Sequence, residues 1–157
     1  MMNTMLDNIH AVKGIDPVAD FNDTTQSTAV VNMSGFNNVL FVYYKGVGTT
    51  GTSTLTVEAC DDIVPTNTTA VPFFYKKVTS TDVETALTKA TSTGFTTTAG
   101  SSQLYLVEVR GGDLASTGYN YVRLKCTEVV NSPVLGGIAI LMGCPRAPQD
   151  KFPTALV

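Results

Sequence analysis

Strict alternation of apolar and polar side chains along residues 119–126 most constrains what this chain can fold into. The alternating sets are Val122, Leu124 and Cys126 on one side and Tyr121, Arg123 and Lys125 on the other. A period of two is typical of a β-strand with one face on a core and the other in water. Strand-like segments precede and follow it, at 104–110 and 135–142. Together these segments predict a protein built from sheets.

The first half of the chain adds further strand patterns. They are expected at 28–33, 38–45, 54–60 and 71–78, with a short helix or strand at 82–90. The Gly/Thr loop after residue 45 predicts a hairpin that joins the strand before it to the strand after it. Pro72 confines its segment to a strand start or a sheet edge, because proline has no N–H for the ladder. The continuous apolar run 39–44 is typical of a strand that is covered on both faces or contacts another subunit.

Some seven to nine short strands, with turn signals about every dozen residues, predict an all-β fold. We expect an antiparallel β-sandwich, or jelly-roll-like domain, at residues 28–144. The chain has 157 residues, of which 43% are hydrophobic, enough for one domain with a real core. Turn residues predict an extended N-terminal arm at 1–27, and three prolines predict a C-terminal arm at 145–157.

The charge pattern argues against several classes of partner. Only 15% of residues are charged and the formal net charge is -3, so the chain lacks the basic surplus that a phosphate backbone requires. No apolar run reaches the length of about 18 to 20 residues that a membrane helix needs, and the start does not look like a signal peptide. We therefore expect no nucleic acid and no membrane as direct partners, and a protein made in the cytoplasm.

No motif for catalysis or cofactor binding stands out. His10 is the single histidine and lies in the expected arm, where no orienting acid is evident. The chain has no P-loop and no dinucleotide-binding glycine motif, so we expect no cofactor. The pair Asp61 and Asp62 suits capping of a turn better than a calcium loop, whose spacing it does not match. Metal is not expected.

Three cysteines are widely separated along the chain: Cys60, Cys126 and Cys144. Their odd number and spacing match neither a dense disulfide framework nor a zinc site, so we expect buried thiols. A bridge between Cys60 and Cys126 across neighbouring strands stays open at this stage, since only the distance between them decides it.

Several segments resemble a family of small tailed-bacteriophage proteins encoded beside the major capsid protein. The resemblance is carried by Thr54-Leu-Thr-Val-Glu-Ala-Cys-Asp-Asp, the run from Thr66 to Lys76, Leu104-Tyr-Leu-Val-Glu-Val, Gly118-Tyr-Asn-Tyr-Val-Arg-Leu-Lys and Gly143-Cys-Pro-Arg-Ala-Pro. It covers most of the chain between residues 9 and 148. Its motifs are structural rather than chemical, so no family active site is carried over.

The resemblance implies a capsid decoration, or cement, protein on the outer surface of a virion assembled in the host cytoplasm. Its expected partners are the major capsid protein and further copies of itself in a homotrimer, and it is not expected to be an enzyme. The expected capsid or subunit contacts are Ile9, His10, Val12, Phe21, Tyr43, Tyr44, Arg146 and Phe152.

A second hypothesis is a head-fibre or tail module that binds host surface glycans. The loops rich in Thr, Ser and Asn at 49–53, 66–69 and 91–98 are suited to supply its hydrogen bonds.

Overall fold

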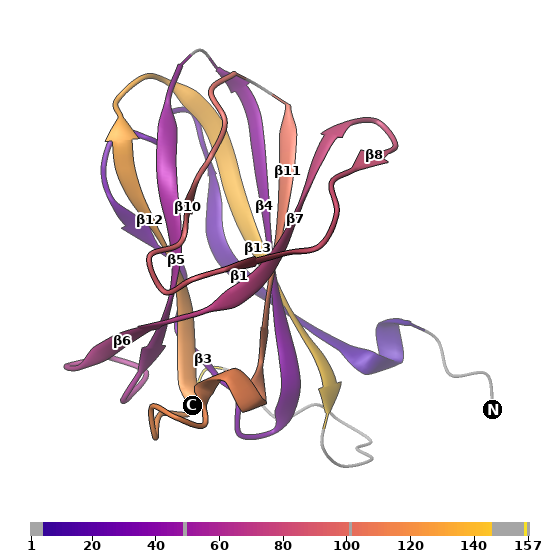
Figure 1. The fold of residues 1–157 in the computed structure, drawn as a ribbon, viewed down its shortest axis with the longest axis vertical. Coiled ribbons are helices and arrows are strands. Elements are labelled where there is room, and N and C mark those ends of the chain that lie inside the picture. The colour runs from indigo at the N-terminus through magenta and orange to yellow at the C-terminus, as the bar shows by residue number, and fades with distance from the viewer. Residues whose placement is uncertain (1–4, 49, 101, 146–155, 157) are drawn as a thin grey trace.

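The computed structural model describes residues 5–48, 50–100, 102–145 and 156, and it shows two antiparallel sheets packed face to face (Figure 1). The expected all-β sandwich is therefore confirmed. No helix among these residues is long and apolar enough to cross a membrane. Two short 3-10 turns, η1 (Leu6–Asn8) and η2 (Gly111–Leu114), are the helical elements of the described chain.

The first sheet has seven strands, in the order β1-β13-β4-β11-β7-β8, with β9 also paired to β7. Their bounds are β1 (Ile9–Val18), β4 (Phe36–Gly48), β7 (Phe73–Ser80), β8 (Val83–Glu84), β9 (Thr88–Ala90), β11 (Gln103–Arg110) and β13 (Val134–Pro145). The pairing of β11 with β4 is in regular register, with Val107 opposite Phe41, and the pairing of β13 with β4, with Leu141 opposite Leu40, has one register shift at Val134/Gly136.

The second sheet has six strands, in the order β10-β5-β12-β2, with β3 paired to β12 and β6 to β5. Their bounds are β2 (Gln26–Ser27), β3 (Val31–Asn32), β5 (Thr52–Cys60), β6 (Thr68–Val71), β10 (Phe95–Thr96) and β12 (Tyr121–Val130). The alternation at 121–126 is confirmed, because Val122, Leu124 and Cys126 are all buried.

The core fills the space between the sheets. Its fully buried side chains include Phe41 and Val107 from the first sheet and Leu55, Val57 and Leu124 from the second. Burial of one such side chain stabilises the fold by about 1.5–3 kcal/mol. The two sheets are thus held together chiefly by apolar contact.

The N-terminal boundary differs from the expected arm at 1–27. Residues 9–18 form strand β1 at the edge of the first sheet, paired with β13 from Ile9 opposite Gly143 to Val18 opposite Gly136. Two register shifts interrupt this pairing, at Lys13/Ile15 and Ile15/Val18. The shifts break the period of two along the strand, so the sequence pattern did not indicate a strand at residues 9–18.

The expected hairpin between 38–45 and 54–60 is wrong. Strand β4 lies in the first sheet and β5 in the second, so the loop between them crosses the sandwich. Pro72 marks a similar crossing, because it separates β6 in the second sheet from β7 in the first. Its predicted place at a strand boundary is confirmed.

The expected strand at 28–33 is reduced to β3 at Val31–Asn32. Thr28 lies between β2 and β3, and its backbone N–H donates to the Leu124 carbonyl (2.9 Å). The Thr28 hydroxyl accepts from the Leu124 N–H (3.1 Å), so a side chain replaces one bond of the ladder. The segment 82–90 contains the two short strands β8 and β9.

Candidate interaction surface

The outer face of the first sheet is apolar across four neighbouring strands. These outward side chains share two properties: none belongs to the core, and each is half-buried or exposed. They are Leu135, Ala139 and Leu141 on β13, Leu40, Val42 and Tyr44 on β4, Leu104 and Leu106 on β11, and Phe74 and Val78 on β7. A sheet face in contact with water normally carries polar residues at these positions.

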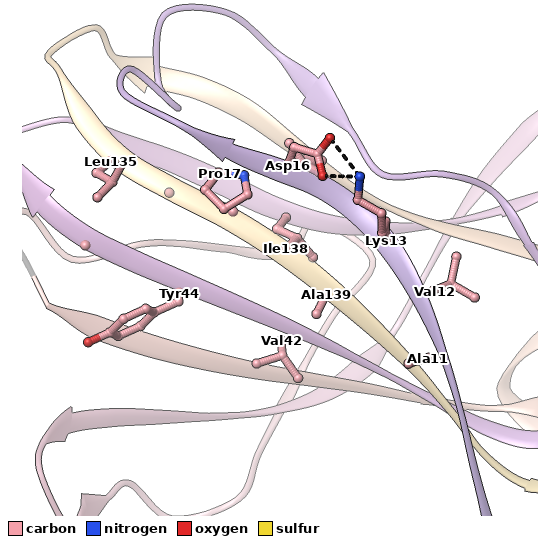
Figure 2. Close-up of a pocket in the computed structure, with 14 residues that line it drawn as sticks. Ala11, Val12, Lys13, Asp16, Pro17, Val42, Tyr44, Leu135, Ile138 and Ala139 are labelled. Atoms are coloured by element: carbon pink, nitrogen blue, oxygen red, sulfur yellow. Dashed lines mark hydrogen bonds and ion pairs between the residues drawn. The ribbon is translucent and has the colours of Figure 1, made fainter. Parts of the chain in front are cut away.

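A groove of about 580 Å³ runs along this face where β1, β13 and β4 meet (Figure 2). Small residues, Gly137 and Ala139, form its floor. Tyr44 and Leu135 stand at one end and are 59% and 45% exposed, while Pro17 lies beside Gly137. The face therefore presents both projecting apolar side chains and a shallow space that can receive them.

Most charged side chains of this face are paired within the chain. Lys13 meets Asp16 at 2.9 Å on the rim of the groove, and Lys76 meets Glu84 at 2.8 Å. A third, looser pair joins Arg110 Nε to a Glu108 carboxylate oxygen at 3.7 Å. These three pairs sum to zero charge, and Lys89, over the Phe74 ring at 5.7 Å, adds one positive charge at the β9 edge of the face.

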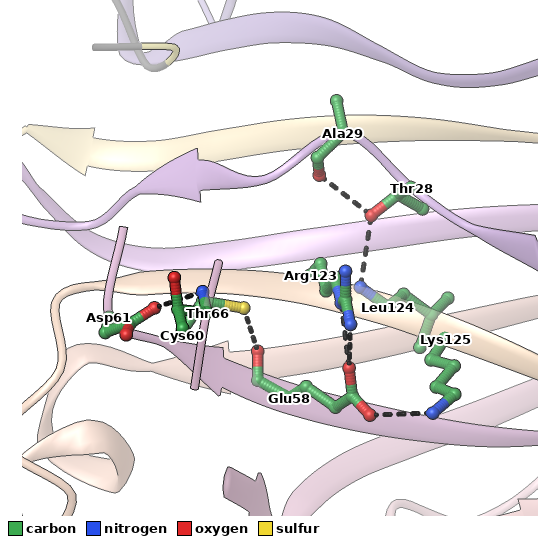
Figure 3. A network of polar contacts seen from close by, with 9 residues as sticks. All are labelled: Thr28, Ala29, Glu58, Cys60, Asp61, Thr66, Arg123, Leu124 and Lys125. Atoms are coloured by element: carbon green, nitrogen blue, oxygen red, sulfur yellow. Dashed lines mark hydrogen bonds and ion pairs between the residues drawn. The ribbon is translucent and has the colours of Figure 1, made fainter. Parts of the chain in front are cut away.

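The outer face of the second sheet is polar and is organised around Glu58 (Figure 3). The Glu58 carboxylate accepts from Arg123 at 2.7 Å and from Lys125 at 3.1 Å, across the pairing of β5 with β12. Burial by itself raises the pKa of Glu58, but the hydrogen bonds and charges of the two cations outweigh it and hold that pKa below its ordinary value. This face is a closed network of ion pairs.

The acidic turn after β5 has a structural role, as expected. The two carboxylate oxygens of Asp61 accept from the backbone N–H groups of Thr66 and Asn67, each at 3.0 Å. The Asn67 side chain adds a third hydrogen bond (2.9 Å), and these bonds lower the pKa of Asp61. Within the described ranges, no group of three or more His, Cys, Asp or Glu residues could hold a metal ion.

Cys60 and Cys126 are both buried free thiols, so the bridge left open by the sequence is not formed. Burial raises the pKa of Cys60 to about 11, and it raises the pKa of Cys126 still further. Thiols of this kind are poor nucleophiles at neutral pH.

The expected contact residues fall into four groups. The Phe21 and Tyr43 side chains are fully buried and stack on each other with ring centroids 4.6 Å apart, so they have no surface for a partner. Half-buried positions on β1 hold Ile9, His10 and Val12. Tyr44 is the most exposed member, and it lies on the groove. Arg146 and Phe152 lie outside the described residues.

Residues on β11 and β7 complete the apolar face, and sequence reasoning missed them. Leu104 and Leu106 lie opposite Tyr44 and Val42, with Val78 opposite Leu104 on the far side. The signal was present, because residues 104–107 form a continuous apolar run like that at 39–44. Two such runs side by side in one sheet predict an apolar outer face.

Comparison with known proteins gives no family for this chain. No family model matches it, and no curated protein matches it. Among solved structures, the SPBc2 prophage-derived protein YomS is similar over 85% of this chain and 93% of its own, with 11% identity and a TM-score of 0.46.

Two viral structures are more distant. A chain of infectious bursal disease virus Gt strain matches over 88% of this chain and 42% of its own, at 13% identity and a TM-score of 0.24. Derived T=1 particles of infectious bursal virus match over 88% and 40%, at 11% identity and the same TM-score. This chain spans less than half the length of these viral chains, and TM-scores this low assign no function.

Proposed function

We propose that this protein is a structural component of a virion that decorates and stabilises a tailed-phage capsid by bridging neighbouring subunits of the major capsid protein. The proposal joins the resemblance described above to one structural observation, the apolar outer face of the first sheet. In this proposal the protein is not an enzyme, and its work is done by contact surfaces repeated over a shell.

The occupant that we assign to the apolar face is a second copy of this chain. The apolar positions span four neighbouring strands, about 4.8 Å apart, and about 5 to 7 residues along most of them, which gives a face of about 300–450 Å². That area lies within the range of the largest patches that monomers leave exposed, about 300–600 Å². It is about half of the roughly 800 Å² per partner that a standard interface buries.

The pairing of charges on this face also favours a second copy of the chain as its partner. Two copies that meet through one face bring identical charges together, and like charges oppose association. Here Lys13 is neutralised by Asp16 and Lys76 by Glu84, so the like charges that a second copy meets are reduced to Lys89 at the β9 edge, which lies over the Phe74 ring. In such a pair, Tyr44 and Leu135 of one copy would pack on the groove floor of the other copy, which is formed by Gly137 and Ala139. The resemblance implies three copies, and such a trimer would need a further contact between two different surfaces, because a face shared by two copies closes at two.

The apolar face is tested by the mass of the purified protein in solution, measured by light scattering after size exclusion. We expect an oligomer for the natural sequence and a shift toward the 16.6 kDa monomer in Tyr44→Asp, whose exposed side chain is not needed by the core. Thr127→Asp, an exposed position on β12 in the other sheet, is the matched control and should keep the oligomer. A monomeric natural protein at micromolar concentration would show that a second copy is the wrong occupant.

The virion role is tested by the copy number of this protein relative to the major capsid protein in purified particles. Quantitative mass spectrometry should give a ratio comparable to that of the capsid protein, as a lattice-wide decoration requires. A handful of copies per particle would instead point to a tail, connector or fibre. Absence from the particle would refute a virion role.

A further inference from the structure

A second cavity, separate from the apolar groove, opens between the two sheets beside β7 and β10. It has a volume of about 290 Å³ and is walled by the aromatic rings of Tyr75, Phe95 and Tyr105. Tyr75 and Phe95 stack with ring centroids 3.9 Å apart, and Phe95 meets Tyr105 at 5.8 Å. Because the first sheet supplies two rings and the second sheet one, this cleft exists only in the folded sandwich.

The polar lining of the cleft consists of one lysine, Lys77, and the hydroxyls of Thr85, Thr88, Thr96 and Thr98. Within the described ranges no acidic side chain lines it. The Lys77 ammonium donates to the Thr98 hydroxyl at 2.8 Å, which uses one of its three N–H groups. No described carboxylate lies within ion-pair distance of it. The Lys77 ammonium therefore has two further N–H groups for a ligand, and it faces a cleft that no described acidic side chain lines.

One threonine hydroxyl keeps a donor for a ligand. Thr85 accepts from the Lys77 backbone N–H at 2.9 Å and donates to no other described group, so its O–H is available to a guest in the cleft. Thr98 accepts from the Lys77 ammonium and also hydrogen-bonds through its side chain to Tyr105, so its hydroxyl holds Lys77 in place and is not counted as a donor to the guest.

A second ammonium lies just behind Thr98. The Lys45 side chain is fully buried and donates to the Thr98 carbonyl at 2.5 Å, again with no described carboxylate in reach. Burial lowers the pKa of Lys45, as expected for a cation removed from water without a counter-ion. Thr98 is thus held between two lysines, and no described carboxylate lies within ion-pair distance of either one.

We propose that this cleft binds one carboxylate-bearing sugar unit of an acidic carbohydrate. Lys77 pairs with the carboxylate, Thr85 donates to a ring hydroxyl, and the half-buried rings of Tyr75 and Phe95 pack against the apolar face of the sugar ring. Charge-assisted hydrogen bonds are the strong ones in such sites, and aromatic rings supply the contact area. The volume is near the lower end of ligand pockets, about 300 Å³, which fits a single ring and not a chain of them.

This site goes beyond the virion role and does not depend on the apolar face. Thr96 and Thr98 belong to the loop 91–98, which the sequence suggested for glycan recognition. The structure adds Tyr75 and Lys77 from β7, which precedes this loop in the sequence, and Tyr105 from β11, which follows it.

The test is a titration of the ¹⁵N-labelled protein, observed by amide chemical shifts, with D-glucuronate as the probe and D-glucose as its neutral counterpart. Glucuronate should shift the amides of Lys77 and Thr98 in a saturable manner, and glucose should bind at least about tenfold more weakly, because loss of a charge-assisted hydrogen bond costs about that factor or more. Equal binding of the two sugars, or no saturable shift, would overturn the proposal.

Two variants test which residues bind the sugar. Lys77→Met should weaken glucuronate binding by about tenfold or more, and Thr85→Val should weaken it in the same direction. The control is Lys76→Met, since Lys76 is the neighbouring lysine on β7 and pairs with Glu84 on the opposite face. A dispersed amide spectrum shows that each variant is folded. Unchanged affinity in folded Lys77→Met or Thr85→Val would refute the assigned roles.

Discussion

Removal of the negative charge of Glu58 should destabilise the fold far more than removal of any exposed carboxylate. Glu58 is 10% exposed at its side chain, and its two partners, Arg123 and Lys125, are 22% and 35% exposed. In Glu58→Gln the shape is kept, but two partly buried cations lose their counter-ion. The amide can still accept one hydrogen bond, so the change isolates the charge.

The magnitude follows from the degree of burial. Loss of one partner from a fully buried ion pair costs about 3–5 kcal/mol, whereas an exposed pair contributes about 0–1 kcal/mol. Arg123 lies between these limits, and Lys125 is too exposed to add much. We therefore expect a loss of about 2 kcal/mol, which lowers Tm by about 4–8 °C in a domain of this size. The control Glu84→Gln breaks the exposed pair with Lys76 and should cost less than about 1 kcal/mol.

Urea unfolding at one fixed protein concentration measures both variants, because self-association would otherwise shift the apparent stability. The pH dependence gives a second readout. Since the pKa of Glu58 is depressed in the folded state, its contribution is complete above the ordinary value near 4.5 and is lost as pH falls through the folded pKa. The difference in the free energy of unfolding between the natural protein and Glu58→Gln should therefore be constant near neutral pH. It should shrink toward zero as the pH falls below 4.5. Equal losses in Glu58→Gln and Glu84→Gln would refute this account.

Two further outcomes are expected. Gly94 has a φ of +74°, and a Cβ there would collide with a main-chain carbonyl of β5, so Gly94→Ala should cost more than about 2 kcal/mol in urea unfolding. Gly118 has the same φ but open space around it, so Gly118→Ala should cost about 1 kcal/mol, and equal costs would contradict the collision. In a Cys144→Ser background, the buried thiols of Cys60 and Cys126 should react with Ellman's reagent only as fast as the fold opens. Rapid reaction of the native protein would contradict their burial.

The sequence was most informative where strands are regular and one face meets water. The alternation at 121–126 identified both a strand and its buried face, because one side packs on a core and the other does not. Pro72 was also informative, since a missing N–H has only a few acceptable places in a sheet.

Strand β1 could not be predicted because its pattern is irregular. Two register shifts and Pro17 break the alternation, and the strand is recognised only through its pairing with β13. The hairpin was mispredicted for a related reason, since a glycine-rich loop looks the same whether it joins strands within a sheet or between sheets. Sheet membership depends on partners distant in sequence.

The candidate surfaces depend on those distant partners too. The apolar run at 39–44 predicted an unusual strand, but the extent of the apolar face appeared only when β4 was found between β11 and β13. In the cleft, Tyr75, Phe95 and Tyr105 come from three separate strands. No local pattern brings them together.

The pairing of β1 with β13 has a consequence for synthesis. At about 5–20 residues per second, β13 leaves the ribosome about 7–26 s after β1, since their paired residues Ile9 and Gly143 are about 130 residues apart. Strand β4 also waits for β13 on one of its edges. The nascent chain thus carries an unfinished first sheet, with open edges and apolar faces, for most of its translation. Slower, cooler expression should raise the soluble yield of this protein, because fewer unfinished chains then meet one another.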